Sequence, residues 1–421
     1  MEGADALRVW WNREPVGTLY RDAQGRMGFR YDERWSRGRG EAISVSLPVR
    51  PEPFEPETLR AHRFFANLLP EGAARASIVR QLRITDTDFD LLRAIGDECA
   101  GALTILAEGR TPPDDARYRE LDGAAFERLV RTRGLLPDEG TRGTHRPRLS
   151  LAGAQDKCAL HRYGEAWLEP LDGAPSTRIL KFESPGFANV LVYEAFLTAL
   201  ARRVGLPVVD VELGRVASGA RFLSVRRYDR TQVGNAAVER LHQEDFCQAL
   251  GIGHERKYEA DGGPTFPDCV ELVRSHSIDP VVDVERLLSW QAFNAVAGNS
   301  DGHAKNLSLL HAPRAGVRLA PFYDLVCTRA IARVDARLAF SIGCQRRPAD
   351  LEGRHWRAFA DACDVGHRFV LDLVRHTLEA TVEAVAPTRT EFERRHGPTS
   401  ALQRVERVIA TQTKRLGRAL D

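Results

Sequence analysis

The chain has 421 residues, of which 43% are hydrophobic and 28% are charged, so it can form two or three domains around a large core. This composition excludes a chain that is disordered throughout. The formal net charge is only +2, which argues against a free-standing protein that binds nucleic acid by charge alone.

Neither a membrane span nor a secretion signal is visible in the sequence. No apolar run approaches the roughly 18 residues that a span needs, and the first residues lack the pattern of a signal peptide. Seven cysteines are scattered without a C-x-x-C pair, which predicts thiols in a reducing compartment and no structural zinc. We therefore expect a cytoplasmic protein without a membrane partner.

The first hundred residues predict a β-rich segment with helices. Alternation and turn signals between Leu7 and Leu47 are typical of antiparallel strands. Apolar residues at helical spacing predict helices over 58–69 and 88–95, and residues 101–107 resemble a strand. A stretch rich in proline and charge then indicates a boundary near residue 110.

The rest of the chain changes from mixed strands to helices. Strands are expected at 158–161, 178–182, 208–215 and 221–226, around a helix at 190–204. Helices are expected at 243–250, 266–274, 283–297, 356–363, 367–385 and 400–420. A β-rich half followed by a helical half predicts an α+β enzyme with two lobes and a cleft.

The densest polar cluster is the loop Gly298–Asn306, between an apolar helix and a strand-like stretch. Asp301 and Asn306 are five positions apart, as are the base Asp and the metal-binding Asn of a protein-kinase catalytic loop. The Asp accepts the proton of an incoming hydroxyl, and an amide oxygen suits Mg²⁺. The alternative is an Asx-rich turn after a helix.

A second candidate is Asp324 in the segment PFYD, which follows the apolar run 317–320. It stands 18 residues after Asn306, in the order in which kinases place their second metal carboxylate. Here the aromatic residues precede the Asp and no Gly follows. The alternative is an N-cap for a helix over 325–332.

Two further elements precede these along the chain. Lys181 lies in the strand RILKF between apolar neighbours, and Glu194 in the next helix is its expected ion-pair partner. The alternatives are a lysine at a strand edge in water and a glutamate on a solvated helix face. The small-residue turn at 149–157 suits phosphate oxygens, although a plain β-turn is the alternative.

The combined pattern is more informative than its parts. Small-residue turn, strand Lys, helix Glu, Asp-x4-Asn loop and strand-end Asp follow one another in kinase order. The chain has only five lysines, and Lys157, Lys181 and Lys305 fall inside these elements. This coincidence favours phosphate handling.

These segments together resemble the HipA family, the kinase toxins of type II toxin–antitoxin modules. The segments that carry the resemblance cover nearly the whole chain in the family's order: FFANLLPEG (64–72), SLAGAQDK (150–157), FLSVRRYDR (222–230), HQEDFCQALG (242–251), KYEADGGP (257–264), NSDGHAKN (299–306) and PFYD (321–324).

The resemblance implies a bilobed protein-kinase-like fold and an enzyme that uses ATP and Mg²⁺ to phosphorylate serine in a protein. We accordingly expect an N-terminal β-rich subdomain at 1–110, a kinase N-lobe with phosphate loop and Lys strand at 111–235, and a mainly helical C-lobe at 236–421. Asp301 then resembles the catalytic base, and Asn306 and Asp324 resemble the Mg²⁺ ligands. The residues that the resemblance places around ATP are Ala152, Gly153, Ala154, Gln155, Asp156, Lys157, Lys181, Arg226, Arg227, Tyr228, His303, Ala304, Lys305, Asn306, Tyr323 and Asp324.

Regulation and partners are also implied by the resemblance. Ser150 occupies the place of a serine that family members autophosphorylate, and a phosphate there would expel the loop from the nucleotide phosphates. Arg226 stands where members often carry glutamate, beside the adenine. Family targets include aminoacyl-tRNA synthetases, whose inhibition causes growth arrest or persistence. The implied partners are a helix-turn-helix antitoxin of the HipB kind and, mainly through it, operator DNA.

Two other functions remain open from the sequence. One is a small-molecule phosphotransferase of the aminoglycoside- or choline-kinase type, which needs an acidic pocket for a cationic acceptor. The acids available for such a pocket are Glu244, Asp245, Glu255, Glu259 and Asp261. The other is a catalytically silent co-repressor bound to the antitoxin.

Overall fold

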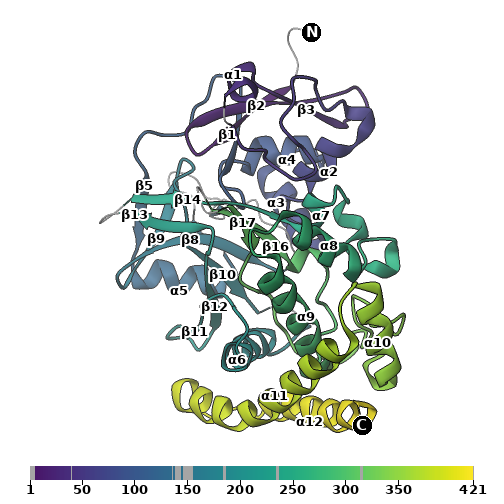
Figure 1. Cartoon of the computed structure of the whole chain (residues 1–421). Helices are drawn as coiled ribbons and strands as arrows, with labels where there is room; N and C mark the ends of the chain where they lie inside the picture. Colours follow the sequence, from purple (N-terminus) through teal and green to yellow (C-terminus); the bar gives the residue numbers. More distant parts are fainter. Residues whose placement is uncertain are drawn as a thin grey trace. The chain divides into compact units, whose positions relative to one another are not determined.

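The structure is a computed structural model, and it describes residues 5–38, 40–134, 136–137, 144–145, 155–183, 186–233, 237–312 and 316–420 (Figure 1). The chain forms two compact units. Unit 1 comprises Met1–Phe182, Gly214–His254 and Leu310–Pro313, and unit 2 comprises Glu183–Leu213, Glu255–Leu309 and Arg314–Asp421.

Unit 1 begins with a four-stranded antiparallel sheet in the order β3-β2-β1-β4, as the alternating pattern predicts. Its strands are β1 (Ala6–Trp11), β2 (Glu14–Arg21), β3 (Met27–Tyr31) and β4 (Leu103–Ala107). The helices in this part are α1 (Glu33–Arg37), the 3₁₀ turn η1 (Pro56–Thr58), α2 (Arg60–Ala66), α3 (Gly72–Leu82) and α4 (Asp88–Ile95). Phenylalanines from the sheet and helices, among them Phe29, Phe65 and Phe89, are fully buried in a shared core.

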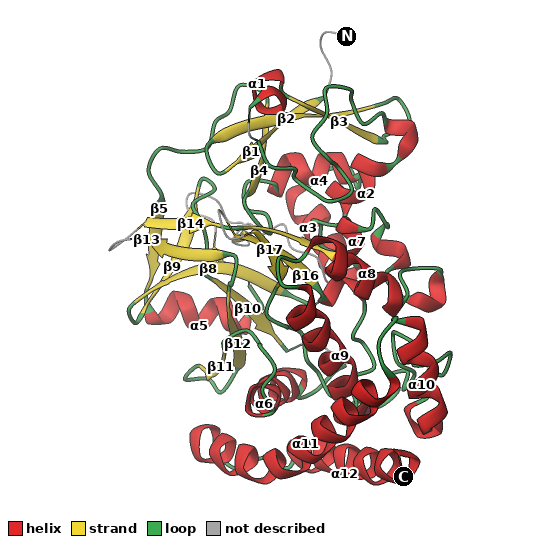
Figure 2. Cartoon of the chain, viewed as in Figure 1, coloured by secondary structure: helices red, strands yellow, loops and turns green. Residues whose placement is uncertain are grey.

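A second sheet of unit 1 has six strands in the order β11-β12-β10-β8-β9-β5 (Figure 2). The strands are β5 (Arg117–Leu121), β8 (Lys157–Tyr163), β9 (Ala166–Leu171), β10 (Arg178–Phe182), β12 (Arg221–Arg226) and β11 (Val211–Arg215), whose first three residues belong to unit 2. Helix α5 (Gly123–Arg131) covers one face, where its Leu129 and Val130 pack with Leu160 and Leu180. β10 is therefore an interior strand with neighbours on both sides.

The remaining elements of unit 1 are short. They are β6 (Leu136–Pro137), β7 (Thr144–His145), β13 (Arg230–Val233), β14 (Ala237–Arg240), β15 (His242–Asp245), α7 (Phe246–Ala249) and the 3₁₀ turn η2 (His254–Arg256), whose last two residues belong to unit 2. The helix predicted over 243–250 is wrong in its first half, which is a strand. Asp245 ends that strand because its carboxylate accepts a hydrogen bond from Gln248 N at 2.8 Å and caps α7.

Unit 2 is mainly helical. Its helices are α6 (Val190–Arg203), η3 (Glu259–Asp261), α8 (Phe266–His276), α9 (Pro280–Ala297), η4 (Ala304–Asn306), η5 (Thr328–Ala330), η6 (Pro348–Asp350), α10 (Gly353–Ala362), α11 (His367–His396) and α12 (Ala401–Leu420). Its strands are β17 (Gly316–Leu319) and the first part of β16 (Ser308–Ala312). Helix α9 lies against α8, α11 and α12 (Figure 1). Its Trp290 and Phe293 are fully buried.

The two last helices differ in how well the sequence predicts them. The helix predicted over 367–385 continues to His396, through Pro387. A proline removes one backbone donor, but contacts of α11 with α6, α9, α10 and α12 hold the helix together. Helix α12 is amphipathic as expected, with Leu402 and Ile409 buried. Its basic residues Arg404, Arg407, Lys414, Arg415 and Arg418 are exposed.

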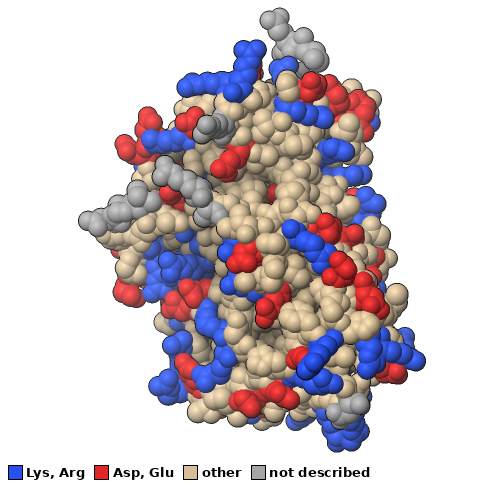
Figure 3. All heavy atoms as spheres, viewed as in Figure 1, with Lys and Arg blue, Asp and Glu red and all other residues tan. Residues whose placement is uncertain are grey.

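The distribution of charged side chains on the surface is consistent with the small net charge. Basic and acidic side chains are interspersed over the face that Figure 3 draws. Within the described ranges, every helix is either too short or too polar to span a bilayer.

Candidate functional site

The polar loop of unit 2 begins where the buried helix α9 ends. Gly298 has a φ of +74°, a left-handed conformation that ends the helix, and its N–H donates to Asn294 O at 3.1 Å. A Cβ at this position would lie 2.5 Å from Val408 Cγ1, so the packing also requires glycine. The loop therefore starts at a fixed point on α9.

Within this loop the predicted base is exposed and the predicted metal ligand is buried. Asp301 is exposed at the surface, and its backbone N–H donates to Asn299 Oδ1 at 3.2 Å. His303, Lys305 and Asn306 are each less than a tenth exposed, and Ala304 is fully buried. His303 N donates to Asn306 Oδ1 at 3.0 Å, which fixes the orientation of the amide.

The segment that carries Asp324 is joined to the loop by hydrogen bonds. Phe322 pairs with the chain after α6, since its N–H donates to Pro207 O at 2.8 Å and its carbonyl accepts from Val209 N at 3.0 Å. Tyr323 donates its hydroxyl to Lys305 O at 2.8 Å. As a result, Asn306 Nδ2 lies 3.5 Å from Asp324 Oδ2.

The alternative interpretation of Asp324 as a helix N-cap is wrong. In the described residues that follow it, the only helical element before residue 348 is the 3₁₀ turn η5. Asp324 itself has a φ of +55°, a left-handed conformation that Asp adopts more readily than most residues with a side chain.

The pair formed by Asn306 and Asp324 has the chemistry of a Mg²⁺ site. Mg²⁺ prefers hard oxygen ligands and is commonly held by one or two carboxylates together with substrate phosphates. An amide oxygen has two lone pairs, so the bond from His303 N does not exclude ligation by Asn306 Oδ1. Among the described residues no cluster of three or more His, Cys, Asp or Glu is arranged as a metal site, and a phosphate-assisted Mg²⁺ site does not need one.

In unit 1, the predicted phosphate-binding lysines face the same side of a sheet. Lys181 lies on the interior strand β10 and is 8% exposed, so its interpretation as a solvated edge residue is wrong. It is directly opposite Lys157 on β8. Opposed positions on neighbouring antiparallel strands carry their side chains on the same face of the sheet.

The residues next to this lysine pair are tied to β10. Gln155 Nε2 donates to Phe182 O at 2.8 Å, and Phe182 N donates to Asp156 O at 3.2 Å. Asp156 also lies 3.8 Å from Arg133 Nε. The other residues predicted for this loop, Ser150, Ala152, Gly153 and Ala154, lie outside the described residues.

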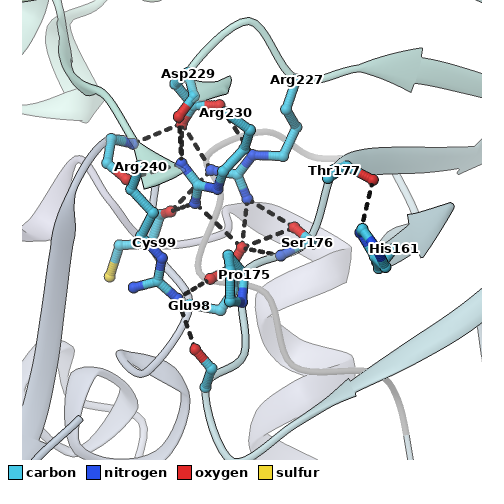
Figure 4. Close-up of polar contacts among 12 residues, drawn as sticks. Glu98, Cys99, His161, Pro175, Ser176, Thr177, Arg227, Asp229, Arg230 and Arg240 are labelled. Atoms are coloured by element: carbon cyan, nitrogen blue, oxygen red, sulfur yellow. Dashed lines mark hydrogen bonds and ion pairs between the residues drawn. The ribbon is translucent and has the colours of Figure 1, made fainter. Parts of the chain in front are cut away.

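The predicted hinge residue Arg227 belongs to a buried cluster of charged side chains (Figure 4). Its guanidinium donates to Glu98 Oε1 at 2.8 Å and to Asp229 Oδ2 at 2.7 Å. Arg230 and Arg240 also bind Glu98, at 3.1 and 2.5 Å. The Arg227 side chain thus ties the predicted hinge segment to the residues before β4, so it is engaged within the protein.

The electrostatics of this cluster are those of a compensated buried network. Burial alone would raise the pKa of Glu98, but the charges of the surrounding arginines, Arg240 first, lower it to about 2. The pKa of Asp229 is likewise lowered, against burial, by Arg227 and Arg230. Both carboxylates are therefore ionised at neutral pH, and each is bound by at least two arginines.

The other predicted hinge and helix residues are placed as follows. Arg226 ends β12, is exposed, and is opposite Arg178 on β10. Tyr228 is half-buried and donates its hydroxyl to Gln243. Glu194 lies on α6 in unit 2 and is 2% exposed, so its interpretation as a solvated residue is wrong.

Three of the five acids considered for a cationic acceptor pocket accept hydrogen bonds from nearby residues of the chain. Glu244 is buried in unit 1, where it accepts from Ser44 Oγ at 2.6 Å and Val45 N at 3.1 Å. Asp245 caps α7. In unit 2, Glu259 accepts from both the N–H and the hydroxyl of Ser341 at 2.6 Å.

Sequence reasoning missed one residue beside the predicted base. Tyr258 donates its hydroxyl to Asp301 Oδ1 at 2.6 Å. The segment KYEADGGP carries part of the family resemblance, but nothing in its spacing indicates that its tyrosine reaches a loop 43 residues further along the chain.

Together, the mixed sheets and helices, the Asp-x4-Asn loop and the downstream Asp define an α+β protein of the kinase-like class. The comparisons with known proteins narrow this class. The HipA N-terminal domain matches residues 7–106, and the HipA-like C-terminal domain matches residues 149–386.

Individual relatives agree with these matches. A putative kinase, Y4mE, of Sinorhizobium fredii is 40% identical over 390 residues, which are 90% of this chain and 91% of that protein. The serine/threonine-protein kinase toxin HipA of Shewanella oneidensis is 29% identical over 338 residues, 77% of this chain and 76% of that protein. A solved structure of Shewanella oneidensis HipA, in a complex with HipB and its operator DNA, has a TM-score of 0.83 at 25% identity and covers 99% of this chain and 98% of that chain.

The chain belongs to the HipA family, whose named members include a serine/threonine-protein kinase toxin and putative kinases. The predicted family and the predicted α+β, kinase-like fold are confirmed.

Proposed function

We propose that this chain is an ATP- and Mg²⁺-dependent serine/threonine protein kinase that acts as the toxin of a toxin–antitoxin module. The observation that carries the proposal is the distance of 3.5 Å between Asn306 and Asp324, in the same unit as the exposed carboxylate of Asp301. Membership of a family with named kinases supports it.

Asp301 is the proposed catalytic base. It is an exposed carboxylate at a fixed place in a loop whose neighbouring residues are buried, so a protein hydroxyl can reach it. A base at this position accepts the proton of the serine hydroxyl as the phosphoryl group is transferred. A positioned acid or base contributes roughly 100- to 10,000-fold to a rate.

Asn306 and Asp324 are the proposed metal ligands. A bound Mg²⁺ would neutralise charge on the phosphates of ATP during transfer. The protein's own contribution is to hold the amide and the carboxylate, which it does through His303 N and through Tyr323 on Lys305 O.

The residues proposed to bind the ATP phosphates and adenine come from several segments of the chain. Lys157 and Lys181, opposed across two strands, provide the positive charge, and residues 152–156 are proposed to form the turn over the phosphates. Arg226, the backbone of Arg227, and Tyr228 are proposed as the hinge beside adenine. His303, Ala304, Lys305 and Tyr323 complete the proposed nucleotide set, and Glu194 is the proposed ion-pair partner of Lys181.

We keep the division into 1–110, 111–235 and 236–421 as a proposal for the functional domains. The separate family matches at 7–106 and 149–386 support a boundary between the first two. Seven thiols without disulfides, all in the described part of the chain, support a cytoplasmic location.

The proposed partners are a helix-turn-helix antitoxin and, mainly through it, operator DNA. The solved Shewanella oneidensis complex of HipA with HipB and operator DNA supports this assembly. The proposed substrate is a translation protein such as an aminoacyl-tRNA synthetase, whose phosphorylation would arrest growth. Autophosphorylation of Ser150 is proposed to limit the activity, on the strength of the SLAGAQDK segment.

The test is incubation of the purified chain with ATP labelled on the γ-phosphate and Mg²⁺, followed by mass spectrometry. We expect label on serine, with Ser150 as the modified position, and no label in Ser150→Ala at that peptide. Phosphoproteomics after induction in the native host then identifies the protein target. Absence of any protein-bound label, with turnover of free small alcohols instead, would contradict the proposal.

A further inference from the structure

The segment KYEADGGP forms a tight turn that holds Tyr258 in place. After Tyr258 the chain makes the 3₁₀ turn η3 and reverses at Gly262, whose φ is +76°. Gly263 N donates back to Tyr258 O at 3.0 Å. A Cβ on Gly263 would lie 1.9 Å from Arg256 O, so only glycine fits there.

A side-chain anchor fixes the same turn to the body of unit 2. Both carboxylate oxygens of Glu259 accept hydrogen bonds from Ser341, each at 2.6 Å. Ser341 follows Phe340, whose ring packs edge-on against Phe266 and Trp290 in the core. The residue next to Tyr258 is thus attached to buried structure.

From this position Tyr258 contacts the proposed catalytic loop twice. Its hydroxyl donates to Asp301 Oδ1 at 2.6 Å, a length typical of a hydroxyl bound to a carboxylate. Its ring lies edge-on to the ring of His303, with centroids 5.0 Å apart. The two contacts together define where the phenol stands relative to the loop.

We propose that Tyr258 is a positioning residue for Asp301, an inference that rests on the proposed function. An exposed carboxylate on a loop rotates, and rotation moves it out of line with an incoming hydroxyl. A carboxylate has about four acceptor positions, so a bond from a phenol to Oδ1 restricts its rotation while a serine hydroxyl can approach another position. The KYEADGGP turn thus holds the hydroxyl of Tyr258 against Asp301.

The decisive variant is Tyr258→Phe, which removes one oxygen and keeps the ring that packs on His303. We expect kcat for phosphoryl transfer to fall about 10- to 100-fold, because a small misplacement of a reacting group costs up to that factor. KM for ATP and the melting temperature should stay at the wild-type values, which separates positioning from a general structural defect.

A matched control is Tyr20→Phe. Tyr20 also donates its hydroxyl to a carboxylate, Glu55 at 3.1 Å, but in the N-terminal sheet of unit 1. The kcat of the Tyr20→Phe variant should equal that of the wild type. A second variant, Glu259→Ala, removes the anchor of the turn and leaves Tyr258 and Asp301 unchanged in sequence. Like Tyr258→Phe, it should lower kcat.

The outcomes are distinguishable. An unchanged kcat in Tyr258→Phe would overturn the inference, and so would an increased kcat, which would mean that the phenol blocks Asp301. A change confined to KM for ATP would also overturn it. If wild type and Asp301→Asn transfer phosphate equally, the proposed function fails instead, whatever Tyr258→Phe does.

Discussion

Replacement of Glu98 by glutamine tests the buried charge cluster around Glu98 and Arg227. The Glu98 side chain is 3% exposed and binds three arginines, so the variant removes a carboxylate partner from all three. Breaking a buried ion pair by removing one partner costs about 3–5 kcal/mol. The pKa of Glu98, lowered from 4.5 to about 2, corresponds to a stabilisation of about 3 kcal/mol at about 1.4 kcal/mol per pKa unit.

The pH dependence of this loss has a definite sign. Because the folded-state pKa of Glu98 is depressed, its contribution is fully present above its unfolded pKa of 4.5 and is lost as the pH falls towards about 2. Urea unfolding at pH 7, followed by tryptophan fluorescence, should therefore show Glu98→Gln to be less stable than wild type by about 3 kcal/mol. The difference should shrink steadily below pH 4.5.

Glu165→Gln is the matched control. Glu165 is 97% exposed and pairs with Arg162 at 3.0 Å in the same unit, and such surface pairs contribute at most about 1 kcal/mol. Two results would refute the assignment of a compensated buried network. One is a Glu98→Gln variant that is no less stable than Glu165→Gln. The other is a loss of unfolding free energy in Glu98→Gln that stays constant down to pH 2.

Two more predictions concern unit 2 and the thiols. Gly298→Ala should lower the free energy of unfolding by about 1–3 kcal/mol, measured by urea titration, because the left-handed φ and the contact with Val408 both oppose a Cβ; an unchanged midpoint would contradict this. A thiol reagent should modify one cysteine, Cys344, rapidly in the native protein and all seven after denaturation, since the other six are buried and burial raises the pKa of Cys327 and Cys363 to about 12. Rapid modification of two or more thiols in the native protein would show that the core opens.

Where the local signals are strong, the sequence predicts the first and last residues of an element correctly. β10 and β12 have the expected bounds because their apolar residues are bounded by clear turns, and α4 starts where Thr87 accepts a hydrogen bond from Asp90 N at 3.1 Å. The continuation of α11 past Pro387 was not predictable, because it depends on packing against other helices of unit 2. Local propensity carries no information about such contacts.

The candidate site shows the same division. The spacing of Asp301 and Asn306 within one loop is a local signal, and so is a lysine between apolar residues on a strand. The approach of Asp324 to Asn306 depends on the pairing of Phe322 with Pro207, more than a hundred residues earlier in the chain. The charge cluster around Glu98 was missed because a buried arginine and an exposed one look alike in a sequence.

The most direct test of the proposed function is the rate of Mg²⁺-dependent phosphoryl transfer from ATP to protein serine in wild type and in Asp301→Asn. Loss of the base should lower the rate by about 100-fold or more. The affinity for Mg-ATP, measured by calorimetry, should remain at the wild-type value, since Asp301 is not a proposed metal ligand. Equal transfer rates in the two proteins would contradict the assignment of this loop as the catalytic site.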